Sequence, residues 1–254
     1  TQMLAAGTGY YILFRGKQGV HIRWSDFRLD LTHMKRAFNI GFPASIEQSM
    51  RALGITMMTF LLAGFGTITL ASYGAGSNIF QVVLIPALGL ATGISTLAGQ
   101  NIGAGNIERA ASVAKLGSIL GFSILTVISI IVFFSAPYLI SFFVPNEPEV
   151  IANGSRFLKI TCLAWGFMGL QLCMTGVLRA SGNMITAMIL TLISQWVLLF
   201  PLAYVLTQKT TLGVDGIWWA FPISHVVIAL ITLSVYAKGD WKKTRLIDED
   251  DRLS

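Results

Sequence analysis

The chain has 254 residues, of which 54% are hydrophobic and 12% are charged, and its mean hydropathy is +0.68. Because a soluble domain carries about 25% charged residues, this composition excludes an ordinary soluble domain and predicts an integral membrane protein. The formal net charge of +6 is not accompanied by any basic nucleic-acid-binding motif, so no nucleic acid is expected as a partner.

The first part of the chain is predicted to hold the end of one membrane helix and a linker. The apolar stretch 3–14 is too short to cross a bilayer, and it lacks the charged flank and cleavage site of a signal peptide. We expect it to be the end of a helix that begins upstream of Thr1, so the chain is predicted to be a fragment. Residues 1–36 are assigned to this helix end and to a cytoplasmic linker that mixes charged and apolar side chains.

Six longer apolar stretches follow, and each is predicted to cross the membrane as a helix. At about 1.5 Å per residue, roughly 20 residues span the hydrocarbon core, and a helix satisfies its own backbone hydrogen bonds in lipid. The six stretches are 37–63, 68–98, 113–143, 151–178, 184–206 and 217–237. The predicted fold class is therefore all-α, with a polytopic six-helix transmembrane bundle over 37–237 and a cytoplasmic tail over 238–254.

The first of these spans carries polar side chains near its middle. Glu47 lies about ten residues in from Ala37, where an ionised side chain costs roughly 2.5–3.5 kcal/mol to insert. Arg51 follows four residues later, so it lies on the same helix face and is positioned to pair with Glu47; Gln48 is the next residue after Glu47. Two interpretations stay open: a buried pair that fixes the orientation of the helix, or the lining of a path for a solute or ion.

Two prolines and four amide side chains extend this polar pattern. Pro43 and Pro86 each free a backbone carbonyl and are predicted to kink a helix, which makes them candidates for gating. The amides are candidates for lining a polar cavity, and their alternative role is hydrogen bonding between helices. These amides are Asn78, Gln81, Gln171 and Gln195.

The cysteines and glycines predict packing more than chemistry. Cys162 and Cys173 are expected on one helix, about 16 Å apart by the helical rise, which is too far for a disulfide. Glycines four residues apart are expected to let membrane helices approach closely. These glycine pairs are Gly89/Gly93, Gly99/Gly103 and Gly117/Gly121.

No pattern in the sequence indicates an enzyme. The three histidines form no metal-ligand cluster, and no serine, histidine and aspartate have the spacing of a catalytic triad. The two Gly-Ala-Gly runs lack the third glycine of a dinucleotide site and the lysine of a phosphate-binding loop. We therefore expect no catalytic residues, no metal, no cofactor and no ATP-driven transport.

The basic residues predict which side of the membrane each loop faces. Of 18 lysines and arginines, 14 lie in the linker, in the tail or beside the loops at Arg109 and Arg179, three (Arg156, Lys159 and Lys209) lie on the alternate side, and Arg51 lies within the first span. By the positive-inside rule, the linker, those two loops and the C-terminus are predicted to be cytoplasmic.

Several segments resemble the multidrug and toxic compound extrusion (MATE) transporters, in particular their DinF-like branch. The most specific match is the run 86–90 that leads into Leu97-Ala98-Gly99-Gln100-Asn101-Ile102-Gly103-Ala104-Gly105, with Arg109-Ala110 after it. The segments 41–48, 65–67 with 71–76, 176–182 and 213–218 also fit. The resemblance covers nearly the whole chain.

The resemblance implies a twelve-helix transporter built from two six-helix halves related by pseudo-twofold symmetry. It implies a multi-pass protein of the cell membrane that exports cationic or amphipathic drugs in exchange for Na⁺ or H⁺. This chain would be the second half, with an N-terminal six-helix half and the lipid bilayer as its partners, and small-molecule drugs or organic cations as ligands. Glu47, Gln48 and Arg51 are then the candidates for transport and cation coupling.

The chain departs from the family pattern in its charged residues. Some branches place the carboxylate of the seventh helix one turn later, where this chain has Arg51, and some carry an acid in the tenth helix, where residues 159–179 have none. DinF-like members also use an aspartate of the first helix, which this chain lacks. Two alternatives stay open: a flippase for lipid-linked saccharides, which would favour a more cationic cavity, and a half-length membrane protein without independent transport.

Overall fold

The computed structural model describes residues 2–15, 30–239 and 241, so most of the predicted linker and tail lies outside the described residues. The chain forms two compact units, Thr1–Phe42 and Pro43–Ser254, each of which is described by itself. The first unit holds α1 (Gln2–Arg15) and the beginning of α2 (Leu31–Ala63). Asp30 starts α2, because its carboxylate accepts a 2.9 Å hydrogen bond from the backbone N–H of Thr32.

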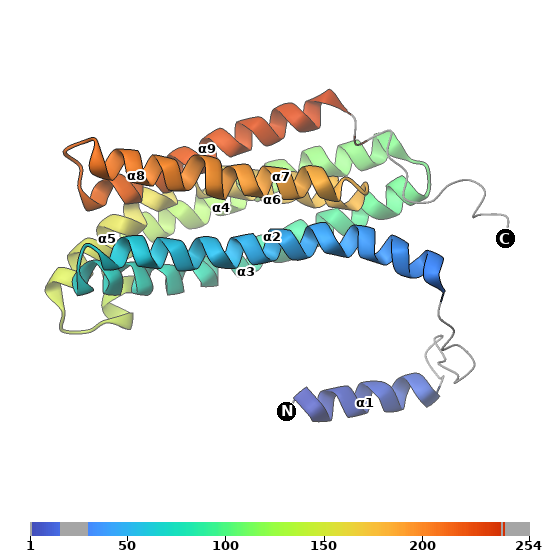
Figure 1. Ribbon diagram of the computed structural model, residues 1–254, viewed down its shortest axis with the longest axis horizontal. Helices are drawn as coiled ribbons and strands as arrows, with labels where there is room; N and C mark the ends of the chain where they lie inside the picture. Colours follow the sequence, from blue (N-terminus) through green and yellow to red (C-terminus); the bar gives the residue numbers. More distant parts are fainter. Residues whose placement is uncertain (1, 16–29, 240, 242–254) are drawn as a thin grey trace. The chain divides into compact units, whose positions relative to one another are not determined.

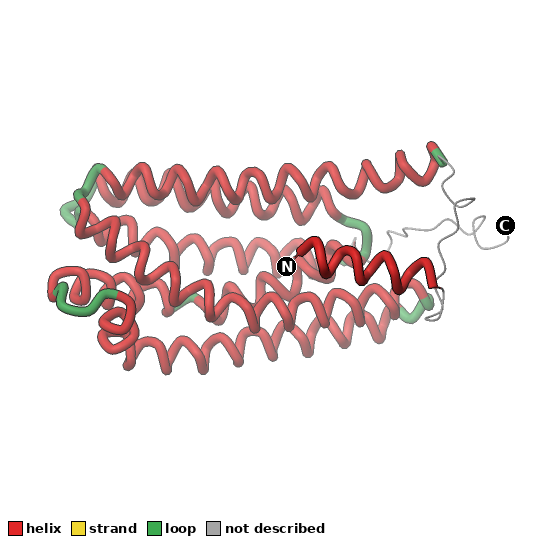
Figure 2. The backbone as a smooth tube through the Cα atoms, turned by 90° about the horizontal axis from the view of Figure 1, so that it is seen from below, coloured by secondary structure: helices red, strands yellow, loops and turns green. Residues whose placement is uncertain are grey.

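The second unit is a helical bundle in which the helices run lengthwise beside one another (Figures 1 and 2). The turns 104–106 and 181–183 lie at one end of this bundle, and the turns 64–66, 144–147 and 209–213 lie at the other (Figure 1). After α2, its elements are α3 (Thr67–Gly103), α4 (Ile107–Phe143), α5 (Pro148–Cys162), α6 (Trp165–Ala180), α7 (Met184–Leu192), the π-helix η2 (Ile193–Leu199), α8 (Phe200–Gln208) and α9 (Val214–Lys238).

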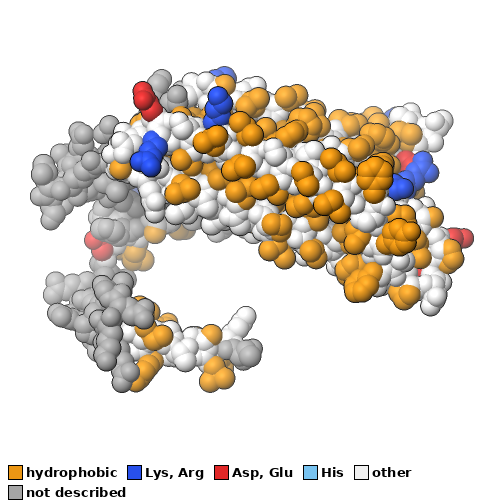
Figure 3. All heavy atoms as spheres, turned by 180° about the vertical axis from the view of Figure 1, so that it is seen from behind, with side chains coloured by type: hydrophobic (Ala, Val, Ile, Leu, Met, Phe, Trp, Pro, Cys, Tyr) orange, Lys and Arg blue, Asp and Glu red, His pale blue; other side chains and the backbone are white. Residues whose placement is uncertain are grey.

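The helices of the described residues are apolar enough for up to five membrane crossings. Four stretches qualify by length and hydropathy, namely α3, α4, the run Met184–Gln208 and α9, and α5 with α6 forms a fifth if the bent pair is one span. On the face shown in Figure 3, hydrophobic side chains extend along the bundle and charged side chains lie toward its ends. The remaining predicted span, 37–63 in α2, does not reach the hydropathy of the others because it includes Glu47, Gln48 and Arg51.

The stretch 151–178 is not one unbroken helix, as predicted, because the structure breaks it into two helices that can still form a single bent crossing. Helix α5 ends at Cys162 and α6 begins at Trp165, with a bend of 52° between them. At the break, the N–H groups of Leu163 and Ala164 make only long 3.4 Å bonds, to carbonyls three residues back. The hydroxyl of Ser129 on α4 donates to the carbonyl of Cys162, which satisfies a backbone group at the break.

The break also changes the interpretation of the two cysteines. Cys162 lies at the end of α5 and Cys173 lies in α6, so they are on different helices and the distance expected along one helix does not apply. Both thiols are buried and free. The two cysteines therefore form no disulfide with each other, although the predicted geometry behind that expectation was wrong.

The glycine pair Gly117/Gly121 packs closely against neighbouring helices. A Cβ on Gly121 would lie 2.9 Å from the carbonyl oxygen of Gly169 in α6, and a Cβ on Gly169 would lie 2.4 Å from the carbonyl oxygen of Gly121. The backbones of α4 and α6 are therefore in direct contact, as the small-residue spacing predicts. Gly89 and Gly93 differ, because no atom of the described residues lies within 4 Å of a Cβ built on either.

This contact predicts a stability difference between two glycine variants. Gly169→Ala should lower the free energy of unfolding by about 1–3 kcal/mol, because the new methyl group meets backbone and not a flexible side chain. Gly93→Ala is the matched control: it has open space at its Cβ and should leave stability unchanged or raise it. Thermal unfolding in detergent would contradict the close contact if both variants melted like the wild-type protein.

Candidate functional site

The buried carboxylate of Glu47 is the centre of a polar cluster in the second unit. Its side chain is only 7% exposed. Its Oε1 atom accepts hydrogen bonds from Nη2 of Arg51 at 3.2 Å, from Nη2 of Arg179, and from Oγ1 of Thr191 at 3.0 Å. The other oxygen, Oε2, accepts no hydrogen bond from any residue that the structure describes. We call Glu47, Arg51, Arg179 and Thr191 the Glu47 cluster.

Three helices bring the cluster together. Arg51 lies one turn after Glu47 on α2, as the four-residue spacing predicts. Arg179 lies in the last turn of α6 and Thr191 lies in α7. Their neighbours Leu178 and Leu190 are each only 2% exposed and belong to one hydrophobic cluster, so apolar packing fixes the two helices that carry the polar partners.

The turn between α6 and α7 sets the position of Arg179. Gly182 has a φ of 86°, its N–H bonds the carbonyl of Arg179 at 3.0 Å, and the N–H of Asn183 bonds the carbonyl of Leu178 at 2.9 Å. These two bonds are the Schellman arrangement that ends a helix at a glycine. The turn reverses the chain within three residues, so α7 returns beside α6 and presents Thr191 to the same carboxylate.

The structure places Glu47 nearer one end of the bundle than the sequence predicts. Arg179 is the next-to-last residue of α6, and Thr191 is seven residues after the start of α7 at Met184. Seven residues correspond to about 10 Å of helix. The carboxylate is therefore nearer the end of the bundle that carries the turns 104–106 and 181–183 than the other end (Figure 1).

Gln195 adjoins the cluster one turn further into the bundle. It lies in η2, four residues after Thr191, and its side chain occupies the space beside Gly54 of α2. A Cβ on Gly54 would lie 2.3 Å from Nε2 of Gln195, so the absence of a side chain at Gly54 is what admits the amide. The π-helical backbone of η2 is a feature found frequently at functional sites.

The remaining predicted residues take no part in the hydrogen bonds of the Glu47 cluster among the described residues. Gln48, Asn78, Gln81 and Pro86 are exposed, Gln171 is half-buried in α6, and Pro43 is buried inside α2. Of the three predicted cation-coupling candidates, the structure thus brings Glu47 and Arg51 together and turns Gln48 outward. Of the four amides, Gln195 alone contacts α2 beside the cluster among the described residues.

Arg179 and Thr191 are the residues that the sequence analysis missed. Arg179 is 132 positions from Glu47 and Thr191 is 144 positions away, so no local spacing connects them. The sequence analysis used Arg179 only as a basic residue beside a loop, and its long side chain explains how it reaches a carboxylate inside the bundle. The only feature of the sequence that pointed to this site was the carboxylate of Glu47 with Arg51 four residues later, among apolar residues.

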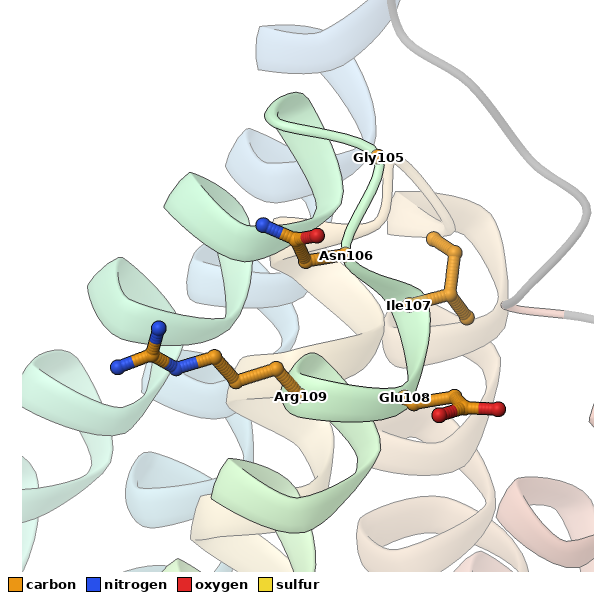
Figure 4. A pocket seen from close by; sticks show the side chains of 5 residues that line it. All are labelled: Gly105, Asn106, Ile107, Glu108 and Arg109. Carbon is orange, nitrogen blue, oxygen red and sulfur yellow. The ribbon is translucent and has the colours of Figure 1, made fainter.

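Two pockets among the described residues lie elsewhere than the Glu47 cluster. One, of about 390 Å³, lies at the turn from α3 to α4 and is lined by 105–109. Figure 4 shows Glu108 and Arg109 pointing away from each other there, so no charged groups converge. The other, of about 780 Å³, lies at the opposite end and includes Arg156, which is ion-paired with Asp215, and Lys159, which stands over the ring of Phe133.

A bundle of long apolar helices with a charged cluster inside it is typical of a multi-pass membrane protein. The MatE family pattern matches residues 43–205, so the chain belongs to the MatE family. This match contains the whole Glu47 cluster.

Individual relatives agree with this assignment. The "Probable multidrug resistance protein NorM" of Thermotoga maritima is 27% identical over 250 residues, which are 98% of this chain and 53% of that protein. The "Probable multidrug resistance protein YpnP" of Bacillus subtilis is 30% identical over 210 residues, which are 83% of this chain and 46% of that protein. The chain thus spans about half the length of the curated relatives it matches.

Solved structures share the fold. "Crystal structure of MATE in complex with MaL6" matches with a TM-score of 0.84 at 21% identity and covers 92% of this chain and 53% of that chain. A transporter from Pyrococcus furiosus matches with a TM-score of 0.75 at 22% identity and covers 85% and 47%. That structure is described as "Reverse polarity of binding pocket suggests different function of a MOP superfamily transporter".

Proposed function

We propose that this chain forms one lobe of a secondary transporter that exports cationic or amphipathic organic compounds across the cell membrane in antiport with Na⁺ or H⁺. The observation that carries the proposal is the MatE match over 43–205, together with relatives named as multidrug resistance proteins. The half-length coverage of these relatives supports a second lobe as the partner, because such transporters place their cavity between two repeats. The proposed activity is transport, not catalysis.

The Glu47 cluster supplies the proposed coupling step. Oε1 is engaged by two arginines and a threonine, whereas Oε2 has no hydrogen-bond partner among the described residues. A proton or Na⁺ that arrives at this carboxylate offsets its charge and competes with both guanidinium groups. Because Arg179 belongs to α6 and Glu47 to α2, the competition weakens a link between two helices, which couples ion occupancy to helix position.

A second candidate function is favoured by the excess of arginine over carboxylate. The cluster contains two guanidinium groups and one carboxylate, so its formal charge is positive. A cationic cavity suits a flippase for lipid-linked saccharides, and the Pyrococcus furiosus transporter is the relative described as having reversed pocket polarity. The two functions differ in substrate charge, because an exporter of organic cations moves ethidium and a flippase of this kind does not.

Ethidium accumulation in cells tests the proposed function. The full-length protein that contains this chain should lower the ethidium content of bacterial cells lacking their own efflux pumps. An inactive variant with the same abundance in the membrane serves as the control. Unchanged ethidium content with confirmed membrane insertion would contradict the export of organic cations and would favour the flippase.

The orientation of the bundle is part of the proposal and can be tested by labelling. With Cys162 and Cys173 replaced by alanine, a cysteine at Asn106 should be protected from impermeant thiol reagents in intact cells, and a cysteine at Glu147 should be labelled. The two positions lie in turns at opposite ends of the bundle, and the basic residues predict that the Asn106 end is cytoplasmic (Figure 1). Labelling of Asn106→Cys with protection of Glu147→Cys would contradict the orientation.

A further inference from the structure

A lysine of α5 lines a pocket of the bundle and has no acidic partner among the described residues. The pocket, of about 780 Å³, is lined by residues of α4, α5 and α9 at the end of the bundle that carries the turn 144–147 (Figure 1). Lys159 is half-buried there, and its Nζ atom lies 5.7 Å from the centre of the Phe133 ring of α4. No carboxylate of the described residues is ion-paired with it. Because ionisable side chains within membrane helices are rare and mostly functional, this lysine calls for a partner.

The charges that line this pocket are of both signs. Arg156 belongs to the lining, and its charge is matched by Asp215 of α9. Glu147, in the turn before α5, also lines the pocket; it is exposed and is ion-paired with no described residue. The pocket therefore offers one positive group, at Lys159, and one negative group, at Glu147. A ligand that carries a phosphate and an ammonium group matches both.

The position of Lys159 along the bundle matches the headgroup level of a bilayer. Helix α4 has 37 residues, or about 55 Å, so when it is centred on a hydrocarbon core of about 30 Å it extends about 12 Å beyond the core at each end. Phe133, whose ring the ammonium group faces, precedes the end of α4 at Phe143 by about 15 Å of helix. The ammonium group is therefore close to the boundary between hydrocarbon and headgroups. Glu147 follows the end of α4, so it lies further toward water.

Aromatic and apolar side chains around the pocket fit the same level. Trp219 of α9 lines the pocket, Tyr138 of α4 is next to the lining residue Pro137, and both aromatic side chains are exposed. Tryptophan and tyrosine are the residues enriched at membrane–water interfaces. Phe134 and Ile130 precede Pro137 by three and seven residues, so they lie on the same face of α4, and both are exposed. An apolar surface for an acyl chain thus adjoins the charged groups.

We propose that this pocket binds the headgroup of a zwitterionic membrane phospholipid with a primary ammonium group, such as phosphatidylethanolamine. Lys159 donates to the phosphate, the N–H groups that Arg156 does not use for Asp215 add to this contact, and Glu147 accepts from the ammonium group. This order matches the lipid in a bilayer, where the ammonium group lies nearest water, the phosphate beneath it and the acyl chains below both. The site is separate from the Glu47 cluster and does not depend on the proposed transport.

Native mass spectrometry of the full-length protein tests this site. The delipidated protein in detergent is titrated with phosphatidylethanolamine and, separately, with phosphatidylglycerol of the same acyl chains, which has the phosphate but no ammonium group. Phosphatidylethanolamine should bind more tightly. Lys159→Gln should weaken the binding of both lipids roughly tenfold, the loss expected for one hydrogen bond to a charged group. Glu147→Gln should weaken the binding of phosphatidylethanolamine several-fold and should not weaken that of phosphatidylglycerol.

Matched variants separate the pocket from general effects of charge. Lys209→Gln removes an exposed lysine at the same end of the bundle, and Glu149→Gln removes an exposed carboxylate two residues from Glu147. Neither side chain lines the pocket, so both variants should bind the two lipids like the wild-type protein. Lys159→Arg keeps the positive charge and should retain most of the affinity. Size-exclusion profiles and melting temperatures verify that each variant is folded.

Three results would overturn the proposal. Equal affinities of the wild-type protein and Lys159→Gln would show that lipid binds only to the general apolar surface. Tighter binding of phosphatidylglycerol than of phosphatidylethanolamine would contradict the role of Glu147. Inorganic phosphate in large excess should not displace the lipid, because it has neither acyl chains nor an ammonium group, and displacement would show a site for small anions instead. None of these measurements involves transport, so their outcome leaves the ethidium export test unaffected.

Discussion

Glu47→Gln is expected to remove the ion dependence of export and to lower the export rate by about tenfold or more. Glutamine keeps the length of the side chain and most of its hydrogen bonding, but it removes the charge that both arginines share. The expected size follows from the loss of charge-assisted hydrogen bonds, which contribute about 1.5–3 kcal/mol each. The measurement is ethidium efflux from energised cells at several Na⁺ concentrations and external pH values.

The matched control for this variant is Glu108→Gln. Glu108 is an exposed carboxylate in the first turn of α4, outside the Glu47 cluster, and its removal changes the net charge by the same amount. Export by Glu108→Gln should equal that of the wild-type protein. If Glu47→Gln also matched the wild-type rate and ion dependence at equal abundance, the cluster would be a structural ion pair and coupling would belong to another part of the transporter.

The second large effect is expected on stability, through the link between α2 and α6. Arg179→Gln should lower the free energy of unfolding by about 2–3 kcal/mol, somewhat less than the usual cost of breaking a buried pair because Arg179 is partly exposed. The double variant Glu47→Gln/Arg179→Gln should lose less than the sum of the single losses, with a coupling of about 1 kcal/mol or more. Unfolding in mixed micelles measures all three variants.

A double-mutant cycle between two residues that do not contact each other provides the reference for that coupling energy. Glu47 and Arg156 share no partner, because Arg156 is paired with Asp215 beside the pocket at the opposite end of the bundle. Their effects on the free energy of unfolding should add to within about 0.5 kcal/mol. Additive behaviour of Glu47 with Arg179 as well would show that the contact between them does not contribute to stability.

Apolar length made most of the fold predictable, and local backbone geometry limited the prediction. Long apolar stretches predict helices because lipid offers no other partner to the backbone. The apolar runs end at Ala98 and resume at Val113, yet the helices continue to Gly103 and restart at Ile107, with Gly105 at a φ of 78° in the short turn between them. The parts of a helix that extend beyond the apolar stretch contain polar residues. A prediction from hydropathy alone therefore makes each helix too short.

The break at Leu163 and the contact of Glu47 with Arg179 could not be predicted from the sequence, because both depend on contacts between different helices. No proline or glycine occupies 162–165, so the bend depends on contacts such as the hydroxyl of Ser129 on another helix. The pairing of Glu47 with Arg51 was predictable because it depends on spacing within one helix. The hydrogen bond from Arg179 depends on how α6 and α7 pack against α2. Residue spacing along the chain gives no information about that packing.

Ion-driven drug movement in proteoliposomes tests the central claim most directly. With the full-length protein reconstituted, an imposed Na⁺ or H⁺ gradient should drive ethidium against its own concentration gradient, and dissipating that gradient with an ionophore should stop the movement. We expect this response to at least one of the two ions, and we expect Glu47→Gln to abolish it. Ethidium movement that continues at the same rate without either gradient, or no movement under both gradients, would contradict the account of this chain as a lobe of an ion-coupled exporter.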